Sequence, residues 1–214
     1  MKYVIMCGGI YPWFKEPRWL MKITHESILE RTLRLLMAQG IRDIAISGFD
    51  RKLYGFGIPV IQPAYNFNLN NEDEFWVDGF VLMHEPVCYL YGDVVYSRAA
   101  IWEIVNCETN DIQFFGSSIP LHESYIKRYA EPFGFKVVDT EHFKQAIELT
   151  KQYHKEGKFL RHPVSWELWQ VIKGTPLNDI RRNYFVINDF TCDVDNYADL
   201  KKLREVVKKY DTWG

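Results

Sequence analysis

The chain has 214 residues, of which 47% are hydrophobic and 25% charged, and its formal net charge at pH 7 is -2. These values are typical of a soluble globular protein with one sizeable core, and no apolar stretch approaches the ~20 residues that cross a bilayer, so we expect one domain and no membrane insertion. The small net charge and the lack of a basic stripe interleaved with aromatic residues argue against DNA and RNA as general partners. Four widely spaced cysteines favour a reducing cytoplasm.

The N-terminal segment has the pattern of a strand, a glycine turn and a helix. Residues 3–6 form an apolar run that breaks at Cys7, Gly8 and Gly9, and helical spacing begins after Ser27. This order places bare backbone N–H groups against a phosphate at the turn. We therefore predict that Cys7, Gly8 and Gly9 bind the phosphates of a nucleotide, although a tight turn alone would also use the glycines.

Strands and helices alternate through the rest of the first half. Ser27 and Glu30 make a capping box at the start of a helix, and Gly40 supplies its stop. Such alternation is typical of a parallel sheet covered on both faces, so we predict an α/β fold, a Rossmann-like three-layer α/β/α sandwich with a mostly parallel sheet. The further elements predicted here are strands at 43–47, 58–61, 87–91 and 112–116 and a helix at 98–105.

The pattern changes after residue 116, and a polar stretch at 62–74 interrupts it earlier. We interpret 62–74 as a loop over one edge of the sheet. The elements predicted after residue 116 are a strand at 133–138, helices at 141–154 and 163–173, a strand at 184–187 and a closing helix at 198–209.

Acidic residues follow two of the strand-like segments. Asp93 comes after the apolar run 89–91 and Gly92, which places it at the carboxyl end of a central strand, where open α/β sheets bind ligands. Asp193 and Asp195 share one face if their segment is extended. Carboxylates at strand ends beside a phosphate-binding turn suit magnesium, so we predict that Asp93, Asp195 and Asp193 bind Mg²⁺. The alternatives are a turn-capping role for Asp93 and a helix-start role for Asp193.

Motifs of several other enzyme classes are missing from the sequence. The six histidines show no H-x-x-x-H or H-E-x-x-H spacing, which argues against a zinc hydrolase. There is no G-x-S-x-G elbow and no G-x-x-x-x-G-K-[ST] loop, which argues against serine hydrolases and P-loop kinases. The prediction of nucleotide chemistry therefore depends on the glycines and the acids.

Five motifs occur in an order that is familiar from one enzyme family. They are Val4-Ile5-Met6-Cys7-Gly8-Gly9, Pro17-Arg18, Ile28-Leu29-Glu30-Arg31-Thr32, Gly92-Asp93-Val94, and Asp193-Val194-Asp195 with Asp199-Leu200. The chain thereby resembles the nucleotidyltransferases that activate sugar phosphates and phosphocholine, most of all the small single-domain cytidylyltransferase-like members. The resemblance implies one nucleotidyltransferase domain over residues 1–214, with acceptor binding at about 117–180. It also implies transfer of a nucleotidyl group from a nucleoside triphosphate to a small phosphorylated acceptor, with Mg²⁺ as cofactor and pyrophosphate as the product that leaves.

The chain departs from the family pattern after the glycine turn. The family has a longer Gly-rich segment containing an Arg, followed by Pro-Lys, whereas this chain has Pro17-Arg18. The planar fork of an arginine differs in geometry from the lysine that binds phosphate oxygens. We predict that Lys15 or Arg18 takes over the contact with the triphosphate, and loss of some activity is the alternative.

Several further residues receive roles from this comparison or from their positions. Asp78 and Gly79 lie where the family recognises the base or the acceptor, and Gly92 is expected beside the nucleotide. Lys136 is predicted to hold the acceptor phosphate, with a solvated edge lysine as the alternative. Other candidates for the acceptor region are Glu131, His162 and the Trp-rich segment 166–169, interpreted as an acceptor wall or a homodimer surface.

The residues themselves identify neither the base nor the acceptor, and it is the resemblance, with the small size of the chain, that favours CTP and a small phosphorylated acceptor used to decorate a surface polysaccharide, with UTP and a sugar phosphate next. Two other functions stay open. A D-x-D triplet also occurs in metal-dependent glycosyltransferases, which use a finished nucleotide sugar and release no pyrophosphate. The missing Pro-Lys also allows a non-catalytic nucleotide-binding protein.

Overall fold

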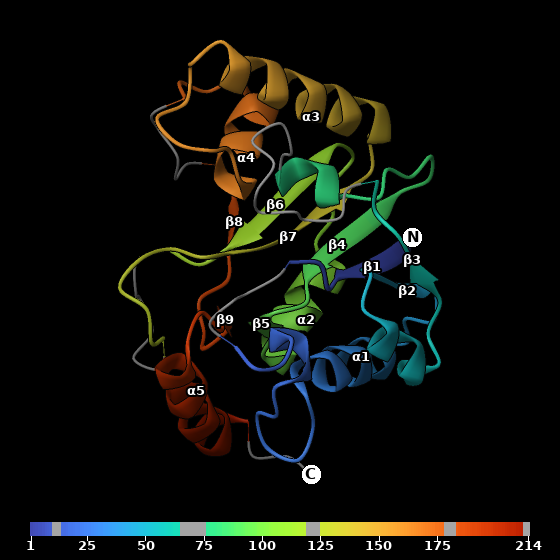
Figure 1. The fold of residues 1–214 in the computed structure, drawn as a ribbon, viewed down its shortest axis with the longest axis vertical. Coiled ribbons are helices and arrows are strands. Elements are labelled where there is room, and N and C mark those ends of the chain that lie inside the picture. The colour runs from blue at the N-terminus through green and yellow to red at the C-terminus, as the bar shows by residue number, and fades with distance from the viewer. Residues whose placement is uncertain (10–13, 65–75, 119–124, 178–182, 212–214) are drawn as a thin grey trace.

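The structure is a computed structural model, and it describes residues 1–9, 14–64, 76–118, 125–177 and 183–211. A seven-stranded sheet runs through its centre, with the strands in the order β3-β2-β1-β4-β7-β6-β8 (Figure 1). The predicted mostly parallel α/β fold is confirmed. The strands of this sheet are β1 (Lys2–Met6), β2 (Ile44–Ser47), β3 (Val60–Ile61), β4 (Val87–Tyr91), β6 (Ile112–Gly116), β7 (Pro132–Val137) and β8 (Phe185–Val186).

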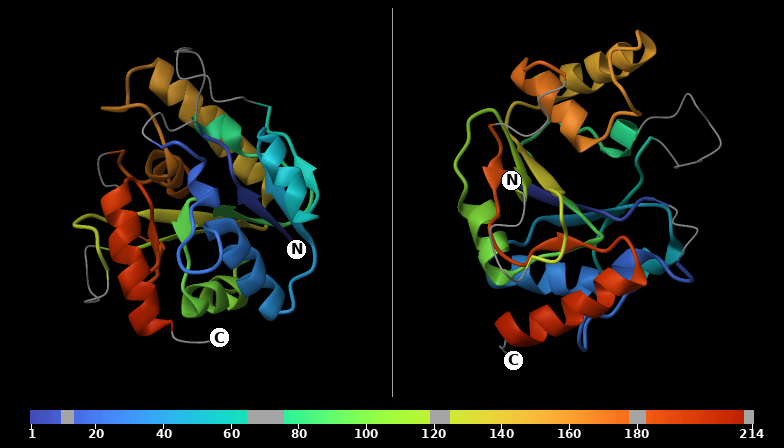
Figure 2. Two further views of the ribbon diagram at one scale, coloured as in Figure 1. Left: turned by 60° about the horizontal axis from the view of Figure 1, so that its bottom comes forward. Right: turned by 90° about the vertical axis from the view of Figure 1, so that its left-hand side faces the viewer.

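Helices cover both faces of the sheet, which gives the three layers expected from the alternating pattern. Figure 2 shows α1 and α2 on one side of the strands and α3 and α4 on the other. Within the described part of the chain, no helix is both long and apolar enough to cross a membrane. The helices are α1 (Ile28–Ala38), α2 (Arg98–Asn106), α3 (Thr140–Lys155), α4 (Ser165–Lys173) and α5 (Tyr197–Tyr210).

The start of α1 shows how local sequence sets an element boundary. The hydroxyl of Ser27 accepts the N–H of Glu30 at 3.2 Å, and the carboxylate of Glu30 accepts the N–H of Ser27 at 2.6 Å. Two of the N–H groups that a helix start leaves without partners are thereby satisfied. The predicted capping box is confirmed, and the buried face of α1, with Leu29, Leu33 and Leu36, packs on the sheet.

One strand of the sheet runs against the others. β7 pairs antiparallel with both β4 and β6, whereas β1 pairs parallel with β2 and β4, and β6 with β8. The start of β7 therefore lies at the same edge of the sheet as the carboxyl ends of β1, β4 and β6. We call this edge the ligand edge, and the opposite one the far edge.

A small second sheet lies beside the first. β5 (Val94–Val95) pairs antiparallel with β9 (Cys192–Asp193), and α5 packs against this ribbon around a separate buried cluster that includes Val194 and Leu203. The alternation pattern did not predict β5 or β9, because two-residue strands have no periodicity. It also missed the short 3-10 helices η1 (Arg18–Leu20), η2 (Arg51–Phe56) and η3 (Trp76–Gly79).

Candidate active site

A cavity of about 520 Å³ opens at the ligand edge of the sheet. This is the edge where open α/β sheets bind ligands, and the volume suits a small molecule. The predicted site residues that line it are Gly8, Arg18, Gly79, Asp93, Asp193 and Asp195. Six of the predicted positions, from four separate parts of the sequence, are thus brought to one place.

The carboxyl ends of β1 and β4 come together through a glycine. The N–H of Gly92 donates to the carbonyl of Met6 at 2.9 Å. A Cβ at position 92 would lie 2.7 Å from that carbonyl oxygen and 2.7 Å from the sulfur of Cys7, closer than carbon atoms approach either group. Gly92 is therefore needed for the strands to close, and this closure sets the position of Asp93.

The glycine turn after β1 places its residues in different surroundings. Gly8 lines the cavity, and Gly9 has a φ of 103°, a conformation that side chains other than glycine rarely adopt. Cys7 does not fit its predicted contact with phosphates, because its N–H donates to the carbonyl of Ser47 at 2.7 Å. Its thiol is buried in the core, and burial raises the pKa of Cys7 well above the usual value. Residues 10–13, which continue the turn, lie outside the described residues.

Arg18 joins the acids that the sequence predicted as metal ligands. One guanidinium nitrogen, Nη2, pairs with the carboxylate of Asp93, and the other, Nη1, lies 3.2 Å from Asp195 Oδ1. Nη1 also donates to the carbonyl of Val194 at 2.7 Å. Only 4% of the Arg18 side chain is exposed. The structure thus places Arg18 beside the acids, and the prediction that it contacts the triphosphate remains untested.

The ribbon of β5 and β9 brings the two groups of acids together. Val94 is opposite Asp193, and the N–H of Val194 donates to the carbonyl of Asp93 at 3.1 Å. Acids separated by 100 positions in the sequence are therefore connected by backbone hydrogen bonds. The sequence predicted that Asp93 and Asp195 act together, but not the ribbon that holds them.

A second buried cation, Lys127, was missed by the sequence analysis. Its ammonium is surrounded by four carboxylates, and only 5% of its side chain is exposed. It belongs to an irregular segment without periodicity, so its position gave no indication of burial. The distances from Nζ are 2.6 Å to Asp195, 2.9 Å to Asp199, 3.0 Å to Asp193 and 3.7 Å to Glu131.

The acids of this group have perturbed pKa values. Burial, with the charge of Asp193, raises the pKa of Glu131 to about 9. Burial likewise raises the pKa of Asp193 to about 7, although the ammonium of Lys127 opposes it. Burial also acts on Asp195, but the hydrogen bond and the charge of Lys127 outweigh it and lower the pKa of Asp195 below its usual value. Asp195 therefore stays ionised in conditions where Glu131 holds a proton.

The donor set of the group fits a hard divalent cation. Oxygens of Glu131, Asp193 and Asp195 lie within 4.8 Å of one another. Oε1 of Glu131 is buried and has no hydrogen-bond partner among the described residues, although the ammonium of Lys127 is 3.7 Å away. Together with Asp93 and Asp199, these three acids make five carboxyl groups around two cations, Arg18 and Lys127. Carboxylate oxygens are the ligands that Mg²⁺ prefers.

The region expected to bind the acceptor contributes one wall of the cavity. Glu131, Ser165 and Trp166 line it, and so does Arg161, a cation that the sequence analysis did not single out. Nε of Arg161 is 2.7 Å from the carboxylate of Glu167, and 55% of the Arg161 side chain is exposed. Part of the predicted section 117–180, namely 119–124 and 178–180, lies outside the described residues.

The Trp-rich segment is inside the protein, which corrects its interpretation as a homodimer surface. Trp169 is fully buried and packs on Phe114, and Trp166 packs edge-on against the same ring. Trp166 still fits a wall for the acceptor because it reaches the cavity. His162, the other candidate here, packs its ring against His154 and does not line the cavity.

Three of the predicted site residues lie away from the cavity. Lys136 is at the far edge, opposite Cys88 at the start of β4, so it does not hold an acceptor phosphate at the ligand edge. Its ammonium donates instead to the carbonyls of Ile104, Val105 and Cys107 at the end of α2. Asp78 pairs with Lys151 of α3, and Lys15 is exposed outside the cavity lining.

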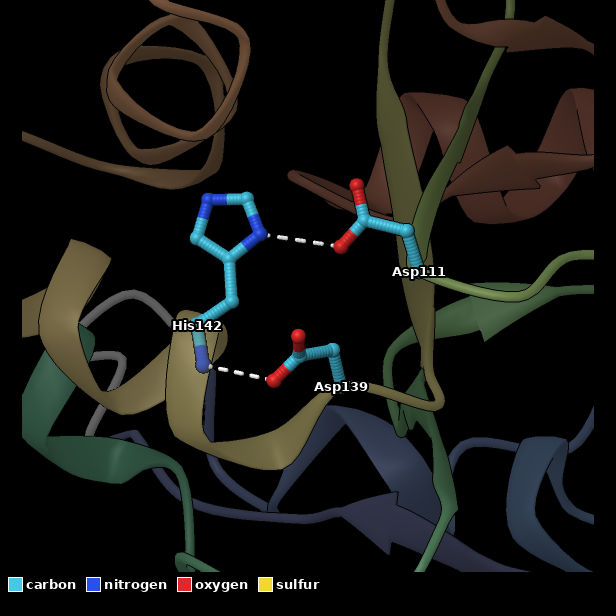
Figure 3. A group of neighbouring side chains, drawn as sticks. All are labelled: Asp111, Asp139 and His142. Atoms are coloured by element: carbon cyan, nitrogen blue, oxygen red, sulfur yellow. Dashed lines mark hydrogen bonds and ion pairs between the residues drawn. The ribbon is translucent and has the colours of Figure 1, made fainter.

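Another group of potential metal ligands lies at the far edge. Figure 3 shows Asp111, Asp139 and His142, where Nδ1 of His142 is 2.9 Å from Asp111 and the N–H of His142 donates to Asp139 at 2.8 Å. Asp139 is the N-cap of α3, and Asp111 pairs with the imidazole. Helix capping and one ion pair account for the arrangement, and we assign no ligand to it.

Comparison with solved structures identifies the class of fold: it is the fold of nucleotidyltransferases. A CTP:phosphocholine cytidylyltransferase from Streptococcus pneumoniae superposes with a TM-score of 0.54 at 12% identity over 96% of this chain and 98% of that chain. An inositol-1-phosphate CTP transferase from T. maritima gives 0.57 at 13% identity, over 97% and 96%. A protein assigned as a glucose-1-phosphate thymidylyltransferase from Bacillus anthracis gives 0.58 at 14% identity, over 100% and 97%.

The similarity extends over nearly the whole chain, and it concerns the fold. By sequence, no protein-family model and no curated protein gives a significant match. The resemblance expected from the motif order is confirmed at the level of the fold. The chemistry of this chain must therefore be argued from its own site.

Proposed function

We propose that this protein is a nucleotidyltransferase that transfers a nucleoside monophosphate from a nucleoside triphosphate to a small phosphorylated acceptor and releases pyrophosphate. The observation that carries the proposal is the convergence of Asp93, Asp193 and Asp195 with Gly8 around one cavity at the ligand edge. The similarity of the fold to enzymes named for CTP and thymidylyl transfer supports it.

Charge makes a divalent cation part of the proposal. A triphosphate is a polyanion, and it would enter a site in which five carboxyl groups face two protein cations. Even with Glu131 protonated, the negative charges there outnumber the positive ones. Like charges at such distances repel. We infer that Asp93 and Asp195 hold Mg²⁺, which, when bound, neutralises the phosphate oxygens and the charge that develops on them.

The residues of the chain position the reacting groups. The backbone of Gly8 and Gly9 approaches the phosphates, and Arg18 supplies a planar pair of donors for them. A phosphate oxygen of the acceptor attacks the α-phosphorus in line, a P–O bond to it forms, and the bond to the leaving pyrophosphate breaks. A phosphate monoester is already anionic near pH 7, so the site needs little acid–base catalysis, and positioning and charge neutralisation supply most of the acceleration.

The acceptor is expected on the side of the cavity formed by residues from the second half of the chain. Arg161 is a cation there that could meet a phosphate, in place of the displaced Lys136, and Trp166 offers an apolar wall. CTP remains our favoured donor and UTP the next, and the four free cysteines fit a cytoplasmic enzyme. Decoration of a surface polysaccharide is the use we infer for the product.

Thermal unfolding with each of CTP, UTP, ATP, GTP and dTTP, with and without Mg²⁺, tests the proposal. A ligand at ~100 times its dissociation constant stabilises the folded state by about 2.7 kcal/mol. We expect one triphosphate to raise the unfolding temperature only with Mg²⁺ and only with Asp93 intact. A shift with nucleotide sugars alone would favour a glycosyltransferase, and no pyrophosphate release with any acceptor would leave only a nucleotide-binding protein.

A further inference from the structure

The carboxylates proposed to hold the metal share one internal cation. The guanidinium of Arg18 pairs with Asp93 through Nη2 and with Asp195 through Nη1, and it lines the cavity. The second oxygen of Asp195 is 2.6 Å from the ammonium of Lys127. Both oxygens of Asp195 therefore already face positive charges of the protein. A divalent cation that binds Asp93 and Asp195 together has to compete with Arg18.

The surroundings of Arg18 limit where it can go. Its side chain is 4% exposed, and its hydrogen bond to the carbonyl of Val194 holds the guanidinium against β9. A guanidinium taken from two carboxylates and kept from water needs another anion. A triphosphate in the cavity is such an anion, because its oxygens match the fork of donors on an arginine.

We propose that Arg18 is a built-in occupant of the metal site, released from Asp93 and Asp195 when a triphosphate enters the cavity. This inference rests on the proposed function and adds a mode of regulation to it. The exchange keeps charges matched, since the carboxylates pass from the guanidinium to the metal while the guanidinium passes to the phosphates. Metal and nucleotide consequently bind in a coupled way, and each binds poorly without the other.

The coupling has a reciprocal consequence. If triphosphate strengthens metal binding by some factor, the metal strengthens triphosphate binding by the same factor. Removal of Arg18 should raise the affinity for the metal alone and reduce that factor. A purely structural ion pair would behave differently, because its loss would disturb the two carboxylates and would not improve metal binding.

Direct titration with Mn²⁺ in the absence of nucleotide tests the inference, with the free ion followed by electron paramagnetic resonance. We compare the wild type with Arg18→Gln, which removes the charge and keeps a polar group of similar length. One hydrogen bond to a charged group contributes roughly as much free energy as a tenfold change in affinity. We therefore expect Arg18→Gln to bind Mn²⁺ about tenfold or more tightly than the wild type.

The matched control is Arg161→Gln. Arg161 also lines the cavity, but its ion pair is with Glu167 and not with Asp93 or Asp195. The Mn²⁺ affinity of this variant should equal that of the wild type. Arg18→Lys, whose single ammonium is a poorer bridge between two carboxylates, should fall between the wild type and Arg18→Gln. It provides the test if Arg18→Gln does not fold, as judged by circular dichroism.

Two results would overturn the inference. Equal or weaker Mn²⁺ binding by the Arg18 variants would mean that the guanidinium does not occupy the metal site, even if the wild type transfers nucleotides. Absence of Mn²⁺ binding by every variant would also overturn it. Tighter Mn²⁺ binding by Arg18→Gln would support it even if no acceptor gave pyrophosphate, so its outcome is separate from that of the proposed function.

Discussion

The two edges of the central sheet use charged side chains in different ways. At the far edge, the ammonium of Lys136 is satisfied by three backbone carbonyls, and Asp139 caps a helix. At the ligand edge, the charges face one another, with Arg18 and Lys127 among five carboxylates. The charged groups at the far edge are neutralised or hydrogen-bonded within the protein. The surplus of carboxylates around the cavity is the feature on which the proposed metal site depends.

This difference gives a way to separate structural from functional charges. Lys136, Arg18 and Lys127 are all buried, which is unusual for charged side chains in either case. The partner decides the role: carbonyls and N–H groups at helix ends indicate stabilisation, whereas several carboxylates without enough cations indicate a site for metal or substrate.

The largest effect is expected for Asp93→Asn at the ligand edge. Loss of the proposed metal ligand should lower the rate of pyrophosphate release by about a hundredfold or more, because a metal contributes several kcal/mol to charge stabilisation. Stability should fall much less than activity, by about 1 kcal/mol, because Arg18 loses one ion pair but keeps its contacts with Asp195 and the carbonyl of Val194. The matched control is Asp111→Asn at the far edge, which should retain full activity. Equal losses in both variants would abolish the distinction between the edges.

Gly92→Ala tests whether the ligand edge depends on close contact of β1 and β4. The added methyl group would lie 2.7 Å from the carbonyl oxygen of Met6. We expect a loss of about 3 kcal/mol in the free energy of unfolding, measured by urea denaturation, because the backbone must move. Gly55→Ala is the control, as its Cβ meets no atom within 4 Å. A neutral Gly92→Ala would show that the strand ends can separate without cost.

Lys136→Met tests the far edge. Loss of the ammonium leaves carbonyls at the end of α2 without their donor, so the free energy of unfolding should fall by about 2 kcal/mol. Turnover of the folded enzyme should stay at the wild-type value. A strong loss of turnover with normal stability would restore Lys136 to the substrate site and contradict its placement here.

Glu26→Gln tests a charge cluster outside both edges. Burial opposes ionisation of Glu26, but its hydrogen bond and ion pair with Arg34, and the charge of Arg31, lower its pKa below the usual value. The stabilisation is complete above pH 4.5 and is lost as the pH falls through the lower pKa of the folded state. We expect Glu26→Gln to lose about 1 kcal/mol at pH 7 and progressively less as the pH falls below 4.5. A difference between the unfolding curves that does not shrink as the pH falls would exclude the ion pair as its cause.

The fold was largely predictable because its long elements have strong local patterns. The capping box at Ser27 and the apolar run of β4 correspond closely to the observed boundaries. The ribbon of β5 and β9 was not predictable, since two residues per strand show no periodicity and their pairing spans about 100 positions. The direction of β7 also depends on contacts between distant segments, which a local pattern does not encode.

Site residues were predictable where a local sequence pattern fixes their position. Asp93 follows a buried strand and a required glycine, so its location at the ligand edge followed from the sequence. Lys127 and Arg161 lie in segments without periodicity, and only folding brings them to the acids or the cavity. The prediction for Lys136 was wrong because the sequence does not say at which edge of the sheet a strand residue lies. The direction of β7 places Lys136 at the far edge.

The antiparallel course of β7 has a consequence for how such a protein can change. If β7 ran parallel to β6, the chain would need a crossover connection back to the opposite edge of the sheet. Instead, β6 ends and β7 begins at the ligand edge, beside the cavity. The connection between them can therefore gain or lose residues without shifting any strand, provided that Lys127 and Glu131 keep their places beside the acids of β9. Under the proposed function, acceptor preference can diverge in this connection while Asp93, Asp193 and Asp195 stay fixed.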